Sequence, residues 1–94
     1  MPGPLAPQEV SASLRQLQGW SAEANNEISR AFRFADHNEA MGFVVRVALA
    51  AEAMNHHPDL RIVYNRVEIK LSTHDAGGVT EKDLELARKI DSYV

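Results

Sequence analysis

The chain has no cysteine among its 94 residues, so neither a disulfide nor a thiolate metal site is available to stabilise it. It also lacks any run of about 20 apolar residues, the length that a membrane span needs. Its N-terminus shows no charged region followed by an apolar one, as a signal peptide would. We therefore expect a cytoplasmic protein without membrane contact. A chain this short buries only roughly 60–65% of the surface that its unfolded form exposes, and such a thin core favours association with a second subunit.

An excess of positive charge is also absent. Ten Lys and Arg residues stand against thirteen Asp and Glu residues, the formal net charge is −3, and the basic residues are scattered along the chain. Proteins that bind nucleic acids directly cluster Lys and Arg against the phosphates. We therefore expect no direct nucleic-acid partner.

Prolines are few, and three of the four fall within residues 1–7. This composition predicts a flexible N-terminal lead-in over 1–7 and a single domain over 8–94. Apolar residues at helical spacing predict a first helix over 8–18, which Gly19 would end in the left-handed conformation.

Two pairs of strands are predicted from the alternation of apolar and polar side chains. Residues 20–23 and 27–34 form the first pair, joined at Asn25-Asn26, a dipeptide that tolerates the positive φ of a tight turn. The second pair spans 60–64 and 67–72, with a turn at Asn65-Arg66. Because the apolar side chains of a strand share one face, we expect one side of the sheet to be covered.

A long helix over 36–55 is predicted between these pairs. Asp36 is its candidate N-cap, with Glu39 reaching back as in a capping box. Val45 and Leu49 form a second apolar strip beside the main apolar face, and a helix that is apolar on two sides usually has two partners. We assign one side to the sheet and the other to a neighbouring subunit.

A last helix is predicted after Thr80, whose N-cap hydroxyl is matched by Asp83 three residues on. The element order is therefore α-β-β-α-β-β-α. This order predicts an α+β domain in which a four-stranded antiparallel sheet carries its three helices on one face.

Three of the four histidines fall with two carboxylates in the second half of the chain. His56 and His57 follow the long helix, His74 follows the last strand, and Glu52 and Asp83 accompany them. A free imidazole titrates at about pH 6.5, so several imidazoles around one cleft suggest general acid–base chemistry at neutral pH.

Each of these residues also has a structural interpretation. Two histidines at a helix C-terminus place favourable charge at the negative end of the helix dipole. Asp83 has a purely structural role if it only returns a hydrogen bond to the N-cap residue Thr80. Trp20 and Tyr64 belong to residue types that are more often core residues than ligand contacts.

The spacing of the set resembles the signature of the pterin-4a-carbinolamine dehydratases. That signature is Glu-x3-His-His-Pro-x5-aromatic-x9-His-x8-Asp, where x is any residue. Its fixed positions correspond here to Glu52, His56-His57-Pro58, Tyr64, His74 and Asp83. The stretches 43–49, 63–65, 71–74 and 80–87, together with Gly19-Trp20, are also similar to the family, so the resemblance runs from about Leu14 to Ile90.

The resemblance implies a reaction and a set of site residues. Water would be lost from 4a-hydroxy-tetrahydropterin to give the quinonoid dihydropterin, which recycles the pterin cofactor of aromatic amino acid hydroxylases. His56 and His74 would be the acid–base pair, His57 would hold the pterin, and Glu52, one turn before His56, would assist. The residues implied to bind the ring beside these histidines are Asn55, Ser72, Thr73, Asp75 and Asp83, with Trp20 as a wall of the pocket.

The resemblance also implies that neither a metal nor an organic cofactor is needed. A three-histidine zinc site is the rival chemistry, but adjacent histidines at a helix end point in divergent directions and no His-x-x-x-His spacing occurs here. The alternative from a different class is an interaction module, because animal members also stabilise dimers of a homeodomain transcription factor through the exposed face of the long helix. Val45 and Leu49 would serve that role, or would join copies of this chain in a homodimer or homotetramer.

Overall fold

Alternation of apolar side chains along the strands gives this chain a sheet with one covered face. The computed structural model describes residues 3–23 and 26–94. In chain order the elements are α1 (Pro7–Leu14), β1 (Ser21–Glu23), β2 (Glu27–Arg33), α2 (His37–Met54), β3 (Asp59–Val63), β4 (Arg66–Leu71), a short 3-10 helix η1 (His74–Ala76) and α3 (Glu81–Asp91). The predicted fold class is confirmed: four antiparallel strands and three helices follow one another in the order α-β-β-α-β-β-α.

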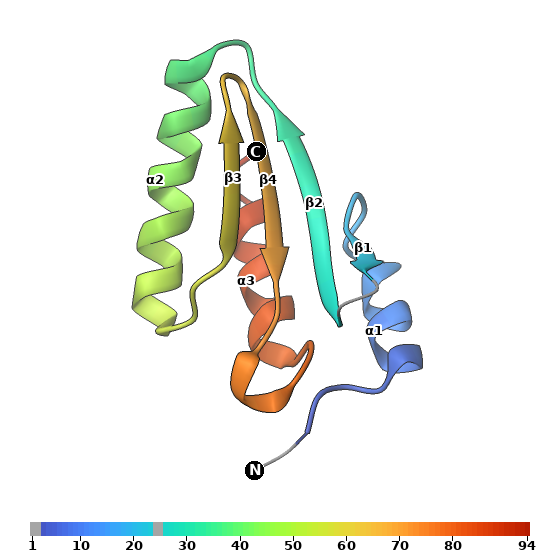
Figure 1. Cartoon of the computed structure of the whole chain (residues 1–94). Coiled ribbons are helices and arrows are strands. Elements are labelled where there is room, and N and C mark those ends of the chain that lie inside the picture. The colour runs from blue at the N-terminus through green and yellow to red at the C-terminus, as the bar shows by residue number, and fades with distance from the viewer. Residues whose placement is uncertain (1–2, 24–25) are drawn as a thin grey trace.

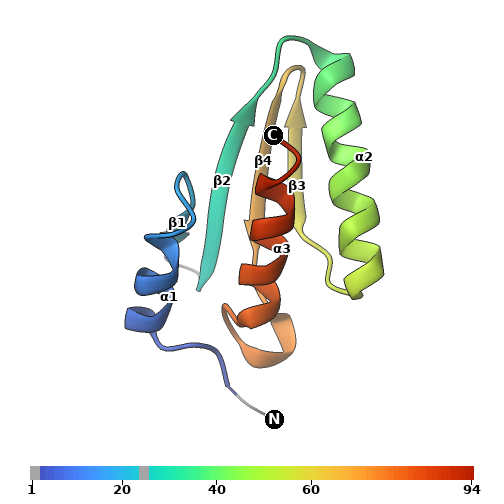
Figure 2. The same ribbon diagram turned by 180° about the vertical axis from the view of Figure 1, so that it is seen from behind.

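The strands lie side by side in the order β1-β2-β4-β3, and every neighbouring pair is antiparallel. Figures 1 and 2 show α2 and α3 on the same side of this sheet, with α3 crossing behind β4 in the first view and in front of it in the second. Val67, Ile69 and Leu71 of β4 are buried under these helices. The side chains between them point to the opposite side, which we call the helix-free face.

The core lies between the sheet and the helices. Ile28 and Phe32 come from β2, and the ring of Phe32 packs against Phe43 of α2 with centroids 4.9 Å apart. Trp20 is buried beside Phe32, and its indole nitrogen donates a hydrogen bond to Asp91 Oδ1 at 2.9 Å. A buried indole usually needs such a partner, so Asp91 of α3 holds this ring in place.

The first helix is shorter than predicted. It ends at Leu14 rather than at residue 18, because the chain tightens into successive turns in which the amide of Leu17 bonds to Leu14 O and that of Trp20 to Leu17 O. These turns bring Leu17 into the core. Gly19 has φ 91°, a backbone conformation that residues with a side chain rarely adopt, so the position favours glycine.

Both hairpin turns were predicted in approximately the right place. Asn25 lies outside the described residues, while Asn26 has φ 59°, the left-handed conformation that such a turn uses. The second turn was predicted one residue too late. Tyr64 has left the strand at φ 51° and Asn65 is its neighbour in the turn, where the Asn65 side chain donates to Phe34 O at 2.8 Å.

The N-terminal segment before α1 is attached to the domain over its described part. The Leu5 amide donates to Val79 O at 2.8 Å, and the Leu5 side chain packs against the core. Residues 3–6 therefore run along the loop before α3.

The long helix α2 begins as predicted. Asp36 is the N-cap and accepts a hydrogen bond from the Glu39 amide at 2.9 Å. The predicted capping box is not formed, because the Glu39 side chain accepts from the amide of Ala35, one residue before the N-cap. Val45 and Leu49 are 53% and 67% exposed, so the second apolar strip is uncovered in the single chain. No helix of the described chain is long and apolar enough to cross a membrane.

Candidate active site

The end of α2 is set by Asn55. This residue adopts the left-handed conformation (φ 52°, ψ 44°), which asparagine tolerates better than most residues. The helix ends at Met54, in agreement with the predicted end at about residue 55, and the His56 amide then donates to Ala51 O at 3.0 Å. After this turn His56 and His57 have different partners, Asp83 and Glu52.

His56 lies in a buried layer under the loops. Its Nε2 is 2.5 Å from Asp83 Oδ1, His56 is 9% exposed, and Asp83 is 0% exposed. The second oxygen of Asp83 accepts from Thr73 Oγ1 and from the Thr80 amide, each at 2.8 Å. Asp83 thus completes the predicted capping box and also binds His56. One carboxylate joins the end of α2, the loop after β4 and the start of α3.

The loop after β4 continues the alternation of the strand. Leu71 is buried, and Thr73 points inward to Asp83. Ser72 and His74, at the alternate positions, point to the helix-free face. The loop is closed by a hydrogen bond from the Thr73 amide to Gly78 O at 2.8 Å. His74 is therefore an exposed side chain on a loop whose backbone is held by hydrogen bonds of Thr73 with Gly77 and Gly78.

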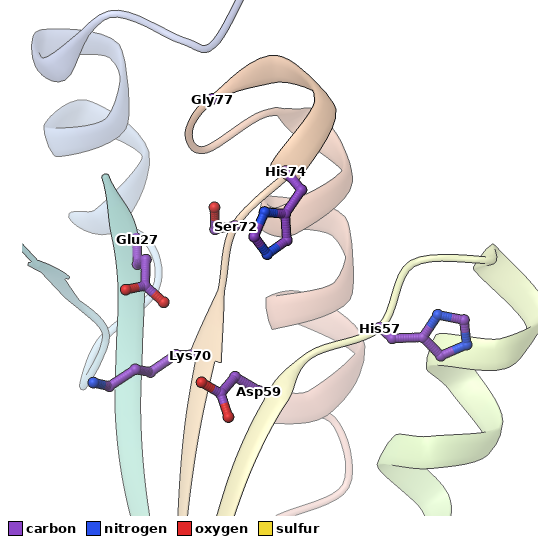
Figure 3. A pocket seen from close by; sticks show the side chains of 7 residues that line it. All are labelled: Glu27, His57, Asp59, Lys70, Ser72, His74 and Gly77. Carbon is purple, nitrogen blue, oxygen red and sulfur yellow. The ribbon is translucent and has the colours of Figure 1, made fainter. Parts of the chain in front are cut away.

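A cavity of about 380 Å³ opens on the helix-free face at this end of the sheet. Its volume is within the range of small-molecule sites. It is lined by Glu27, His57, Asp59, Lys70, Ser72, His74 and Gly77 (Figure 3). The lining joins two histidines and a serine to three charged side chains from β2, β3 and β4.

His57 is paired with Glu52 at the rim of this cavity. The distance between His57 Nε2 and Glu52 Oε1 is 2.7 Å, and the His57 side chain is 56% exposed. In Figure 3 the His57 ring turns toward α2, away from His74. The three histidines of the motif thus take three positions: His56 is buried, His57 is at the rim, and His74 is in the cavity wall.

Other residues that the resemblance implied for the site lie elsewhere. Trp20 is a core residue held by Asp91, and it is not among the described residues that line the cavity. Asn55 caps α2. Thr73 and Asp75 border a different hollow of about 440 Å³, together with Thr80 and Glu81 at the start of α3. Asp83 is fully buried, so its carboxylate is out of reach of a ligand in the cavity.

The sequence reasoning missed the part of the cavity that the strands supply. Glu27, Asp59 and Lys70 were not among the predicted site residues. Lys70 stands two residues before Ser72 and therefore shares its face, a signal that the alternation contained. That Asp59 lies opposite Lys70 depends on the register between β3 and β4, which the alternation alone does not fix.

The cavity presents imidazole, carboxylate, ammonium and hydroxyl groups to one small volume, a set suited to proton transfer on a polar ligand. Among the described residues, no three His, Asp or Glu side chains gather closely enough to hold a metal ion.

Comparison with known proteins points to one family. The family described as pterin 4 alpha carbinolamine dehydratase matches residues 3–93. A relative from Burkholderia orbicola is 56% identical over 93% of this chain and 86% of its own length, and one from Chloroflexus aggregans is 55% identical over 96% of both. Both carry the name of candidate pterin-4-alpha-carbinolamine dehydratases.

Solved structures agree. A crystal structure from Brucella melitensis, described as a transcriptional coactivator/pterin dehydratase, superposes with a TM-score of 0.94 at 40% identity and covers 97% of this chain and 98% of that one. A pterin dehydratase-like protein described as a RuBisCO assembly factor has the same fold, with a TM-score of 0.70 at 18% identity over 81% of this chain and 89% of that one. By sequence over nearly its whole length and by fold, the chain belongs to the pterin 4 alpha carbinolamine dehydratase family.

Proposed function

We propose that this protein is a 4a-hydroxytetrahydropterin dehydratase, a hydro-lyase that removes water from 4a-hydroxy-tetrahydropterin and releases the quinonoid dihydropterin. Family membership supports the substrate class. The observation that carries the proposal is the cavity on the helix-free face, where His74, Ser72 and His57 stand beside a buried His56–Asp83 pair.

The reaction needs two proton movements. The bond between C4a and the hydroxyl oxygen breaks as that oxygen takes a proton and leaves as water, and the N5 proton leaves as the C4a=N5 double bond forms. His74 is the group that protonates the departing hydroxyl, because its exposed imidazole faces the cavity from a fixed loop. His57 accepts the N5 proton. Its Nε2 is engaged by Glu52, so the accepting atom is Nδ1. Nδ1 faces the pterin after a rotation of the His57 side chain, which its exposure permits.

His56 has a positioning role in this proposal and does not contact the substrate. Its Nε2 is engaged by Asp83, and Asp83 in turn holds Thr73, the residue before His74. The pair therefore positions both ends of the site rather than contacting the ring. This modifies the sequence-based role of His56 as the direct partner of His74.

The setting of the reaction is part of the proposal. We infer that the protein works in the cytoplasm, recycles the pterin cofactor of an aromatic amino acid hydroxylase, and forms a homo-oligomer through the Val45–Leu49 strip. The exposure of that strip supports the last inference.

The exposed strip also favours a second candidate function, that of an interaction module for another protein. The Brucella melitensis relative is described as a transcriptional coactivator as well as a pterin dehydratase. A protein without the reaction would have no need of His74 and His57 in one cavity, so the enzyme is the better-supported candidate.

The test is a dehydration assay on the purified protein. A hydroxylase generates 4a-hydroxy-tetrahydrobiopterin, and the rate of its dehydration is followed by ultraviolet absorbance with and without this protein. We expect acceleration that persists after exhaustive chelation, because the proposed groups are imidazoles. An unchanged rate, or a rate lost on chelation and restored by zinc, would contradict the proposal.

A further inference from the structure

Three charged side chains of the cavity have no part in the proton transfers proposed above. Glu27, Asp59 and Lys70 come from the helix-free face of β2, β3 and β4. Asp59 and Lys70 are directly opposite each other in the register of β3 and β4. Side chains opposite each other in an antiparallel pair have Cβ atoms about 4.5–5.5 Å apart, so these two form one feature of the cavity floor.

The carboxylate of Asp59 and the ammonium of Lys70 are available to a ligand. Among the described residues, neither side chain makes a hydrogen bond or an ion pair. Their neighbour Glu68 differs, because Arg61 and Arg66 approach its carboxylate at 3.7 and 3.3 Å. Figure 3 shows the Asp59 carboxylate below Ser72 and His74, with the Lys70 side chain extending toward β2.

The pyrimidine half of a pterin matches this pair of charges. One edge of that ring carries the 2-amino group, the N3–H and the O4 carbonyl oxygen, which are two donors followed by an acceptor. A carboxylate accepts two parallel N–H bonds from such a fork, as it does from a guanidinium. An ammonium is a donor only, so it complements the carbonyl oxygen.

We propose that Asp59 accepts hydrogen bonds from the 2-amino group and N3–H of the pterin, and that Lys70 donates to O4. This inference rests on the proposed dehydratase function. It makes the two strand residues the determinants of specificity for a 2-amino-4-oxo ring. C4, which carries the anchored oxygen, is bonded to C4a, so this docking holds the reacting carbon beside the wall formed by Ser72 and His74.

Binding without turnover tests the inference. Fluorescence titration compares biopterin with the corresponding lumazine, in which an oxygen replaces the 2-amino group. We expect the wild-type protein to prefer biopterin by about tenfold to hundredfold, the range of a hydrogen bond to a charged group. In Asp59→Asn the new amide replaces one acceptor oxygen by a donor, so the preference should fall to about unity or reverse.

Two further variants separate the roles. Lys70→Met should weaken both ligands to a similar extent, because both carry O4. Glu27→Gln is the matched control: it removes the other carboxylate of the cavity, and we expect it to keep the preference for biopterin. Asp59 is exposed, and circular dichroism checks that each variant keeps the fold.

The results distinguish this inference from the dehydratase proposal. A wild-type protein that accelerates dehydration but binds both ligands equally overturns the Asp59 assignment alone. A preference that survives Asp59→Asn, or that disappears in Glu27→Gln, overturns it as well. A protein that binds neither ligand and dehydrates nothing overturns both.

Discussion

Replacing His56 with Ala should destabilise the protein far more than replacing its neighbour His57. In His56→Ala the Asp83 carboxylate keeps its bonds from Thr73 and Thr80 but loses the shortest of its three contacts. Asp83 is 0% exposed, so water cannot replace the lost imidazole without opening the loops. In His57→Ala the lost partner is the exposed Glu52, which water solvates freely.

The size of the effect follows from this contrast. A hydrogen bond to a charged group contributes about 1.5–3 kcal/mol, and removing one partner of a buried ion pair costs about 3–5 kcal/mol. Because two donors remain on Asp83, we expect about 2–3 kcal/mol for His56→Ala. A chain of this length has a free energy of unfolding of about 5–14 kcal/mol. An exposed pair such as Glu52–His57 contributes about 0–1 kcal/mol.

Urea denaturation at one fixed protein concentration measures both variants, since association makes stability depend on concentration. A double-mutant cycle with Asp83→Asn isolates the His56–Asp83 interaction, for which we expect a coupling above about 1 kcal/mol. If His56→Ala costs no more than His57→Ala, the buried His56–Asp83 pair does not stabilise the junction of α2 with the loops.

Three further predictions concern other parts of the molecule. His57→Ala should lower kcat by roughly 100-fold while circular dichroism stays unchanged; unfolding would show a structural histidine instead. Val45→Glu with Leu49→Lys should reduce the mass measured by light scattering and leave dehydration intact; a wild-type monomer at micromolar concentration would refute the interface. Trp20→Phe should lower the free energy of unfolding by about 1 kcal/mol, because the hydrogen bond to Asp91 is lost, and should retain activity. A large loss of activity would show that Trp20 contributes to the active site.

Much of the fold was predictable because burial follows short-range periodicity. Alternation along β4 indicated its buried face, and the caps Asp36 and Thr80 marked the helix starts. The end of α1 was missed because Leu17, which fits the helical pattern, reaches the core through tight turns instead. Tyr64 was placed in a strand because it continues the alternation of Leu60 and Ile62, although the turn needs a residue with positive φ there.

The candidate site was predictable as a set of residues but not as an arrangement. The spacing brought out all three histidines, yet their directions depend on the left-handed Asn55 and on the alternation that continues past β4. A motif does not show which of two adjacent histidines is buried. The charged floor, with Asp59 opposite Lys70, depends on strand register and so needed the structure.

If the cavity containing His74 is the active site, substitutions at two neighbouring positions of its loop should differ in their effect on the rate. His74→Ala removes an imidazole from the cavity, whereas Asp75→Asn, at the next position of the same loop, changes a side chain that borders the other hollow. The measurement is the dehydration rate of 4a-hydroxy-tetrahydrobiopterin at saturating substrate. We predict a loss of roughly 100-fold or more for His74→Ala and a rate close to wild type for Asp75→Asn. Equal rates for His74→Ala and the wild-type protein would show that the active site lies elsewhere.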